Sequence, residues 1–252
     1  ILYSKLNKIY PQIKAGEYLV KDDISLEHLA NLLTSGKVFY RKITFPEGIT
    51  AEQAANLLYD NEYLTADFDN ISDGSILPET YTFSRGTSRN TIVIEARKAL
   101  DNVLDKAWNE KEADLPLKSK HEMLILASIV EKETGVAAER PKIASVFINR
   151  LRKGMMLQTD PTIIYAITKG REELKRPLTR KDLEIDSPYN TYKNVGLPPT
   201  PICNPGRDAI MAVAHPYKTP YLYFVASGNG GHNFARSLSE HNENVRKWRQ
   251  LK

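Results

Sequence analysis

Hydrophobic and polar positions follow a helical period along most of this chain and a strand period in a few segments. The longest apolar run covers 123–130 and lies between Ser119 and Gly135. Ser119 and Glu122 have the spacing of a capping box, and Gly135 is a natural helix stop, so this segment is predicted to be a helix. Its apolar residues recur at i, i+4 and i+7 from Met123, which predicts that this face packs against a core.

The same two periods predict the remaining elements. Helices are expected from Ser25 to Gly36, after the Thr50–Gln53 capping box, over 91–109 behind Asn90, over about 139–152, and after Asp160-Pro161, Asn204-Pro205 and the Ser237–Glu240 capping box. Strands are expected over 13–20, 38–45, 221–226 and 232–234, and 60–89 is expected to be rich in loops. The fold class is therefore α+β. A small α/β unit over 1–45 precedes a largely helical domain over 46–252 with a short β-hairpin, and their boundary lies between 45 and 90.

Composition narrows the classes of function. Hydrophobic residues make up 41% and charged residues 26% of 252, as in an ordinary globular protein. Residues 1–120 carry 15 basic and 18 acidic side chains, whereas 121–252 carry 20 and 13. The excess of basic side chains in 121–252 is typical of a protein that binds an anionic polymer. This part has no arginine-rich helix or RNA-binding aromatic signature, so no nucleic-acid partner is expected.

Metal and cofactor sites are not expected either. Cys203 is the single cysteine, which excludes an internal disulfide and a cysteine-rich metal site. Histidines at zinc-binding spacing, phosphate-binding loops, dinucleotide fingerprints and serine-hydrolase motifs do not occur. The longest apolar run is too short to span a bilayer. Because the chain begins with Ile1, it is expected to be part of a longer protein whose signal peptide or anchor lies upstream.

Glu131 is the candidate for acid catalysis. It follows Ala127 by four residues, so it lies at the margin of the apolar stripe, where lost solvation raises the pKa of a carboxyl group. Glu133 lies about 200° further round the helix and cannot share that position, which indicates one acid rather than two. The alternative is a solvated glutamate, or one paired with Lys132 or Arg140.

Two polar clusters are candidates for binding a sugar. The segment 157–165 contains Gln158, Thr159 and Asp160 at the mouth of a helix, where Asp160 is either a helix cap or part of a site. The segment Tyr189-Asn190-Thr191-Tyr192 combines aromatic rings with amide and hydroxyl groups. Aromatic faces cover the C–H surface of a sugar, and amides pair with its hydroxyl and N-acetyl groups. The alternative is that these tyrosines pack a loop.

Together these motifs resemble the MltG (YceG-like) endolytic murein transglycosylases. The resemblance rests on Pro46-Glu47-Gly48, Pro78-Glu79-Thr80-Tyr81, Ala127-Ser-Ile-Val-Glu-Lys-Glu-Thr134, Ala144-Ser-Val-Phe-Ile-Asn-Arg-Leu151, Leu157-Gln-Thr-Asp-Pro161, Tyr189-Asn-Thr-Tyr192, Gly196-Leu-Pro-Pro199 and Tyr221-Leu-Tyr-Phe-Val-Ala226. It covers nearly the whole chain and is dense from 120 to 252. The unit over 1–45 is similar to the LysM-like part of that family, and its start is expected to be cut off in this chain.

The resemblance implies a bacterial enzyme held at the inner membrane by a single-pass anchor absent from this chain, with its catalytic part in the periplasm. Its substrate would be the glycan strands of peptidoglycan, cleaved internally between N-acetylmuramic acid and N-acetylglucosamine to leave 1,6-anhydro ends, without a cofactor. Peptidoglycan synthases would be possible partners. The motif match implies Glu131 as acid and then base, Glu133 as possible support, and as substrate-binding residues Gln158, Thr159, Asp160, Tyr189, Asn190, Thr191 and Tyr192.

Two other functions stay open. The first is a non-catalytic module that binds peptidoglycan for other enzymes. The second is a hydrolytic muramidase that uses Asp160 as a second carboxylate, because hydrolytic glycosidases usually need two carboxylates.

Overall fold

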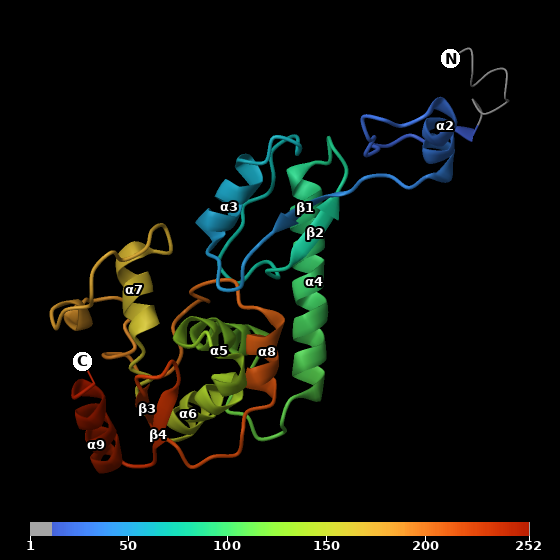
Figure 1. Ribbon diagram of the computed structural model, residues 1–252. Coiled ribbons are helices and arrows are strands. Elements are labelled where there is room, and N and C mark those ends of the chain that lie inside the picture. Colours follow the sequence, from blue (N-terminus) through green and yellow to red (C-terminus); the bar gives the residue numbers. More distant parts are fainter. Residues whose placement is uncertain (1–11, 252) are drawn as a thin grey trace.

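The fold is α+β in the computed structural model, which describes residues 12–251 (Figure 1). Its helices are α2 (Leu26–Ser35), α3 (Ala51–Tyr59), α4 (Arg89–Glu110), α5 (Lys120–Glu133), α6 (Arg140–Arg152), α7 (Asp160–Thr168), α8 (Arg207–Ala214) and α9 (Leu238–Arg249), with short 3-10 turns η2 (Ala137–Glu139) and η3 (Asp182–Glu184). Its strands are β1 (Arg41–Thr44), β2 (Thr80–Phe83), β3 (Tyr223–Ala226) and β4 (His232–Ala235). Within 12–251, no helix is long and apolar enough to cross a membrane.

Helix α5 is the centre of the larger hydrophobic core. All its residues from Met123 to Val130 are buried, and α4, α6, α7 and α8 pack around it. The prediction of a helix with one apolar face is therefore too narrow, because neighbours cover α5 on every side. A helix enclosed in this way carries a carboxylate only at its end, where it meets the surface, and α5 ends with two of them, Glu131 and Glu133.

Helix α4 joins this core to a smaller one. Its first half, from Ile92 to Ala96, packs with α3 and the β1–β2 sheet, and its second half, from Leu100 to Ala107, packs against α5. Strand β1 pairs antiparallel with β2, with Arg41 opposite Phe83. The sheet thus connects segments on the two sides of residue 45, where the sequence places a boundary.

The second hairpin lies beside α6 and α9. Strands β3 and β4 pair antiparallel, and α9 packs against both strands. His232 at the start of β4 is held by Glu139 of η2, which accepts from the His232 backbone N–H at 3.0 Å and lies 2.7 Å from its Nδ1. The ring of Phe224 on β3 then packs edge-on against both His232 and Phe147 of α6. These contacts fix the position of Phe224, which lines a cavity beside the end of α5.

Several helix boundaries follow their predicted caps and others do not. Ser25, Thr50, Ser119 and Ser237 cap their helices as predicted. The prediction that Asn90 caps α4 is wrong. The cap is Ser88, two residues earlier, whose side chain accepts a hydrogen bond from the backbone N–H of Asn90. Three other boundaries differ from the prediction by one or two residues. Helix α5 ends before Thr134 rather than at Gly135, and the cap residues of α7 and α8 are Thr159 and Gly206 rather than Asp160 and Asn204.

The N-terminal part projects from the body of the molecule, as Figure 1 shows for α2. The predicted strand over 13–20 does not form. Tyr18 caps the carbonyl groups of Lys14 and Leu33 with its hydroxyl instead, and Lys14 N–H donates to Leu33. Strand β2, in contrast, was missed, because Thr80–Phe83 is too short and too close to Pro78 to stand out from the loop around it.

Candidate active site

A cavity of about 340 Å³ opens beside the end of α5. It is lined by Glu133, Arg150, Leu157, Gln158, Asp160, Tyr192, Tyr223, Phe224, Leu238 and His241. These residues come from α5, α6, the segment before α7, the start of α7, the loop after η3, strand β3 and helix α9. The cavity therefore exists only once elements distant in the sequence have packed together.

Glu133 is one of two carboxylates that line this cavity, and Asp160 is the other. Loss of solvation raises its pKa to about 7, although the hydroxyl of Thr159, which donates to Glu133 Oε1, favours the charged form. The negative charge of Asp160 raises the pKa further, whereas His232 and Arg150 lower it. A carboxyl group that titrates near pH 7 beside an open cavity can both donate and accept a proton.

Asp160 and Tyr192 form the polar rim of the cavity. The Tyr192 hydroxyl donates to Asp160 Oδ1 at 2.5 Å, and Asp160 is exposed at the start of α7. Gln158 is also exposed, and its φ of +49° lies in the left-handed region that non-glycine residues seldom adopt. Its N–H donates to Thr191 O at 3.0 Å, which holds the strained backbone in place. Such strain is often found where a site must aim a side chain.

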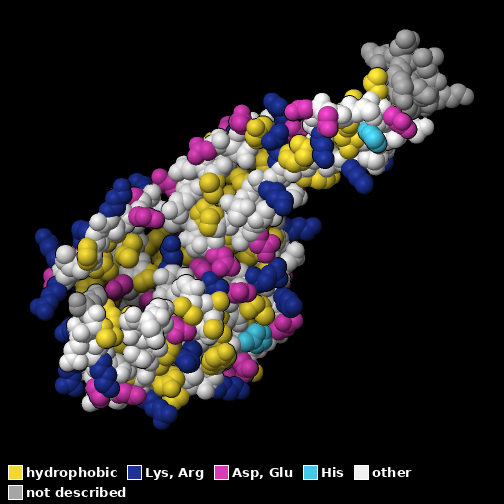
Figure 2. All heavy atoms as spheres, in the orientation of Figure 1, with side chains coloured by type: hydrophobic (Ala, Val, Ile, Leu, Met, Phe, Trp, Pro, Cys, Tyr) yellow, Lys and Arg dark blue, Asp and Glu magenta, His cyan; other side chains and the backbone are white. Residues whose placement is uncertain are grey.

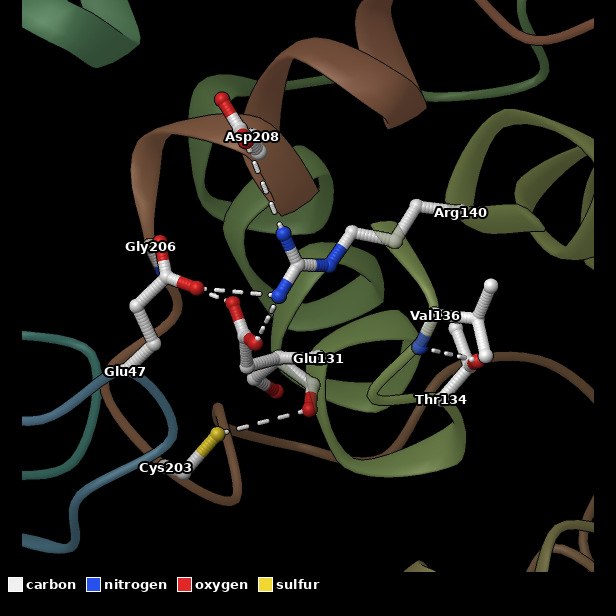
Figure 3. A network of polar contacts seen from close by, with 9 residues as sticks. Glu47, Glu131, Thr134, Val136, Arg140, Cys203, Gly206 and Asp208 are labelled. Carbon is white, nitrogen blue, oxygen red and sulfur yellow. Dashed lines mark hydrogen bonds and ion pairs between the residues drawn. The ribbon is translucent and has the colours of Figure 1, made fainter. Parts of the chain in front are cut away.

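Glu131 lies in a different environment, drawn in Figure 3. Its side chain is only 5% exposed, and its two oxygens accept from Gly206 N–H at 2.8 Å and from Arg140 Nη2 at 2.9 Å. The same Nη2 donates to Glu47 at 2.9 Å, and Asp208 lies 3.7 Å from Nη1. Glu131 is thus paired with Arg140, which is the alternative to acid catalysis that the sequence left open.

This network joins the segment after β1 to the end of α5 and to the starts of α6 and α8. Burial raises the pKa of Glu131, while the Gly206 N–H and Arg140 work in the opposite direction. A side chain at Gly206 would meet the side chain of Glu47, which would then have to leave its present position beside Arg140. Glu131 is not among the residues that line the cavity, and its oxygens are already occupied. Its geometry suits the fixing of α5 and α8 rather than contact with a ligand.

The predicted sugar-binding residues separate into two groups. Gln158, Asp160 and Tyr192 line the cavity with Glu133, and Thr159 contacts Glu133 directly. Tyr189, Asn190 and Thr191 instead make contacts within the protein.

Asn190 is fully buried, with its amide nitrogen donating to Leu183 O and Ile185 O and its oxygen accepting from Tyr192 N–H. Every hydrogen-bonding atom of its side chain is therefore used within the protein, and the expected contact with a sugar is not available to it. Thr191 is buried and shares a hydroxyl contact of 2.8 Å with Thr162. Tyr189 packs against Tyr165, with ring centroids 4.8 Å apart, away from the residues that line the cavity.

The sequence did not predict six of the residues that line the cavity, namely Arg150, Leu157, Tyr223, Phe224, Leu238 and His241. Arg150 stands in the matched segment 144–151 and carried no signal of its own, since arginines on helices are usually exposed. Within 12–251, no group of three or more histidine, cysteine, aspartate or glutamate side chains is arranged to hold a metal ion.

These observations define an α+β protein whose cavity is built around one carboxyl group with a pKa near neutrality. The sequence profile of the YceG-like family matches residues 1–247, and the chain belongs to that family.

Relatives support this assignment. The chain is 35% identical to an endolytic murein transglycosylase of Bacillus subtilis, over 93% of this chain and 73% of the relative. It is 31% identical to an endolytic murein transglycosylase of Streptococcus pneumoniae, over 94% of this chain and 51% of the relative. A crystal structure of a YceG-like protein from Listeria monocytogenes superposes with a TM-score of 0.67 at 35% identity, covering 96% of this chain and 88% of that one.

Proposed function

We propose that this chain is a peptidoglycan lytic transglycosylase in which Glu133 serves as acid and then as base. The observation that carries the proposal is that Glu133, with a pKa raised to about 7, lines a cavity together with Gln158, Asp160 and Tyr192. The relatives named as endolytic murein transglycosylases give the substrate class, and cleavage within the strand between N-acetylmuramic acid and N-acetylglucosamine is part of the proposal.

The reaction needs one proton donor. Protonated Glu133 gives its proton to the glycosidic oxygen while the bond from that oxygen to the anomeric carbon breaks. The 6-hydroxyl oxygen of the same muramyl residue then bonds to the anomeric carbon, and the Glu133 carboxylate removes the hydroxyl proton. The products are a strand ending in a free 4-hydroxyl group and a strand ending in a 1,6-anhydro ring. Glu133 returns to its starting form.

This proposal moves the acid from Glu131, the residue predicted from the sequence, to Glu133. A general acid must reach the substrate within hydrogen-bond distance. Glu133 borders the cavity, whereas the oxygens of Glu131 are held by Arg140 and Gly206. We assign Glu131 the role of anchoring the end of α5, so that Glu133 is held in a fixed position two residues later.

The rim residues would bind the sugar. Gln158 and Asp160 are exposed toward the cavity and can pair with hydroxyl and N-acetyl groups, and the ring of Tyr192 can cover a sugar face. Thr159 would hold the Glu133 carboxylate after the proton has left. Asn190 and Thr191 would act through the loop that places Tyr192.

Hydrolysis is a second candidate, because Asp160 lines the same cavity as Glu133. In a muramidase, Asp160 would assist the attack of a water molecule or stabilise the developing positive charge on the sugar, and the products would have reducing ends. Asp160 is exposed, and its Oδ1 accepts from the Tyr192 hydroxyl.

Product analysis of Asp160→Asn separates the two mechanisms. We expect the wild-type protein to release fragments with anhydro ends that take up no heavy oxygen from labelled water, and Asp160→Asn to give the same ends at a rate reduced by about tenfold, since Asp160 positions Tyr192. Muropeptide mass spectrometry after digestion of sacculi measures both. Labelled reducing ends from the wild-type protein, lost in Asp160→Asn, would establish the muramidase instead.

The N-terminal arm, residues 1–39, is proposed to bind the glycan strand as a LysM-like unit. Apolar side chains lie on its surface in Figure 2, and Leu19 is 72% exposed. Leu19 also lines a surface hollow of about 590 Å³ together with Ile24, His28 and Asn31. Membrane attachment and synthase partners stay predictions from the family resemblance.

Deletion of residues 1–39 tests this arm without removing strand β1. We expect binding to isolated sacculi, measured by co-sedimentation, to weaken by about tenfold, because one of two linked binding elements is lost. Turnover of a short soluble glycan should change by less than about twofold, since that substrate cannot reach both elements. An equal loss in the two assays would mean that the arm stabilises the catalytic part and does not hold the strand.

A further inference from the structure

Arg150 is a buried cation whose protein partners are all uncharged. It lies on α6 and is 7% exposed. Its Nε donates to Leu222 O at 2.7 Å, and its Nη1 donates to the carbonyl oxygens of Leu157 at 2.9 Å and Met156 at 3.1 Å. The amide oxygen of Gln158 is a more distant acceptor at 3.5 Å. These bonds fix the plane of the guanidinium group, and every acceptor in them is uncharged.

The second terminal nitrogen is free. Among residues 12–251, no carboxylate forms an ion pair with Arg150, and its Nη2 has no hydrogen-bond partner. Buried charges in proteins are normally paired, because removing a cation from water is costly. Burial accordingly lowers the pKa of Arg150. An anion is therefore the missing component of this environment.

The cavity gives an anion access to Arg150. Arg150 and Glu133 line it together, and the guanidinium carbon of Arg150 lies 5.0 Å from the centre of the Tyr223 ring. Glu133 acts on Arg150 electrostatically but forms no hydrogen bond or ion pair with it, because Glu133 Oε1 accepts from Thr159. Asp160 is engaged with Tyr192 at the rim. A ligand carboxylate that enters past Tyr223 would meet the open edge of the guanidinium group.

We propose that Arg150 binds the lactyl carboxylate of a muramyl residue that carries no stem peptide. This inference rests on the proposed function. The two sugars of peptidoglycan differ by the lactyl ether on the muramyl residue, whose carboxyl group is charged only where no peptide is attached. Guanidinium binds a carboxylate through charge-assisted hydrogen bonds, which are stronger than those to a neutral amide. Arg150 would therefore select muramyl over glucosaminyl residues in the cavity and favour stretches of strand without peptides.

A comparison of three tetrasaccharides tests this selection. The first has two disaccharide repeats with free lactyl carboxylates, the second is its methyl ester, and the third is the tetramer of N-acetylglucosamine. Binding to the full chain carrying Glu133→Gln, which prevents cleavage during the measurement, is followed by calorimetry or NMR titration. We expect the free carboxylate form to bind at least about tenfold more tightly than either neutral tetramer. The preference should shrink at high salt, as an ionic contact requires.

Variants then assign the preference to Arg150. In Arg150→Gln the tetrasaccharides should bind with nearly equal affinity, whereas Arg152→Gln, an exposed arginine paired with Asp114 outside this cavity, should keep the full preference. Circular dichroism checks folding, and if Arg150→Gln does not fold, the ligand series with the parent protein still decides the point. Equal binding of the acid and its ester to a folded protein overturns the inference.

The two proposals fail in different ways. If the wild-type chain cleaves sacculi but does not distinguish the acid from the ester, only the role of Arg150 falls. If it cleaves no glycan strand, the proposed function falls, and a preference for the acid that depends on Arg150 would remain as a binding property.

Discussion

Glu133→Gln is expected to remove nearly all strand cleavage and to leave the fold intact. The amide has the size of the carboxyl group and can still accept from Thr159, but it cannot give a proton to the glycosidic oxygen or take one from the 6-hydroxyl. Loss of a general acid or base typically lowers the rate by about 10²–10⁴-fold, and here one residue serves both steps. The measurement is the release of muropeptide fragments from sacculi, with circular dichroism as the check on folding.

Glu131→Gln is the matched control, since it lies two residues earlier on the same helix end. It keeps a side chain of the same shape but weakens the contacts with Arg140 and Gly206. We expect a loss of stability, with an activity at least about tenfold above that of Glu133→Gln. A folded, inactive Glu131→Gln beside an active Glu133→Gln would restore the acid predicted from the sequence.

The rate of cleavage is expected to fall with rising pH through about 7. Glu133 has to be protonated before it can act as an acid, and its pKa is raised to about 7. Above that pH, kcat/KM should drop by about tenfold for each further pH unit. Because the charge of Asp160 is one cause of the raised pKa, Asp160→Asn should move the descent to lower pH. A profile that is flat from pH 6 to 9 would contradict the assignment of Glu133.

The same carboxyl group makes stability depend on pH. Its pKa is higher in the folded chain than the ordinary value of 4.5, so between these two values the folded state binds more protons than the unfolded state. The free energy of unfolding therefore falls as pH rises from 4.5 to about 7, by roughly 3 kcal/mol for this group. Glu133→Gln lacks this loss, and denaturant unfolding at pH 5 and pH 8 should show a smaller decrease than in the wild-type chain.

Local sequence patterns determined most of the helices. Caps such as Ser25, Thr50 and Ser237 act within three residues of the chain, which is why they could be read correctly. The β3–β4 hairpin was equally visible, because its glycine turn joins neighbouring segments. Strand β2 was not, since its partner β1 lies about forty residues away and supplies the reason for its extended form.

The two glutamates at the end of α5 show which part of the site the sequence could not predict. It determined that the apolar helix ends in carboxylates, that Glu131 and Glu133 face different directions, and which family the motifs resemble. Which glutamate meets a cavity depended on what packs outside the helix: Arg140 and Gly206 cover one side, while Arg150, Asp160 and Tyr192 surround an opening on the other. Solvation and charge set the pKa of each carboxyl group, and both are properties of neighbours brought together by folding. Helical period alone gave the directions of the two side chains, and only the tertiary structure decided what each of them reaches.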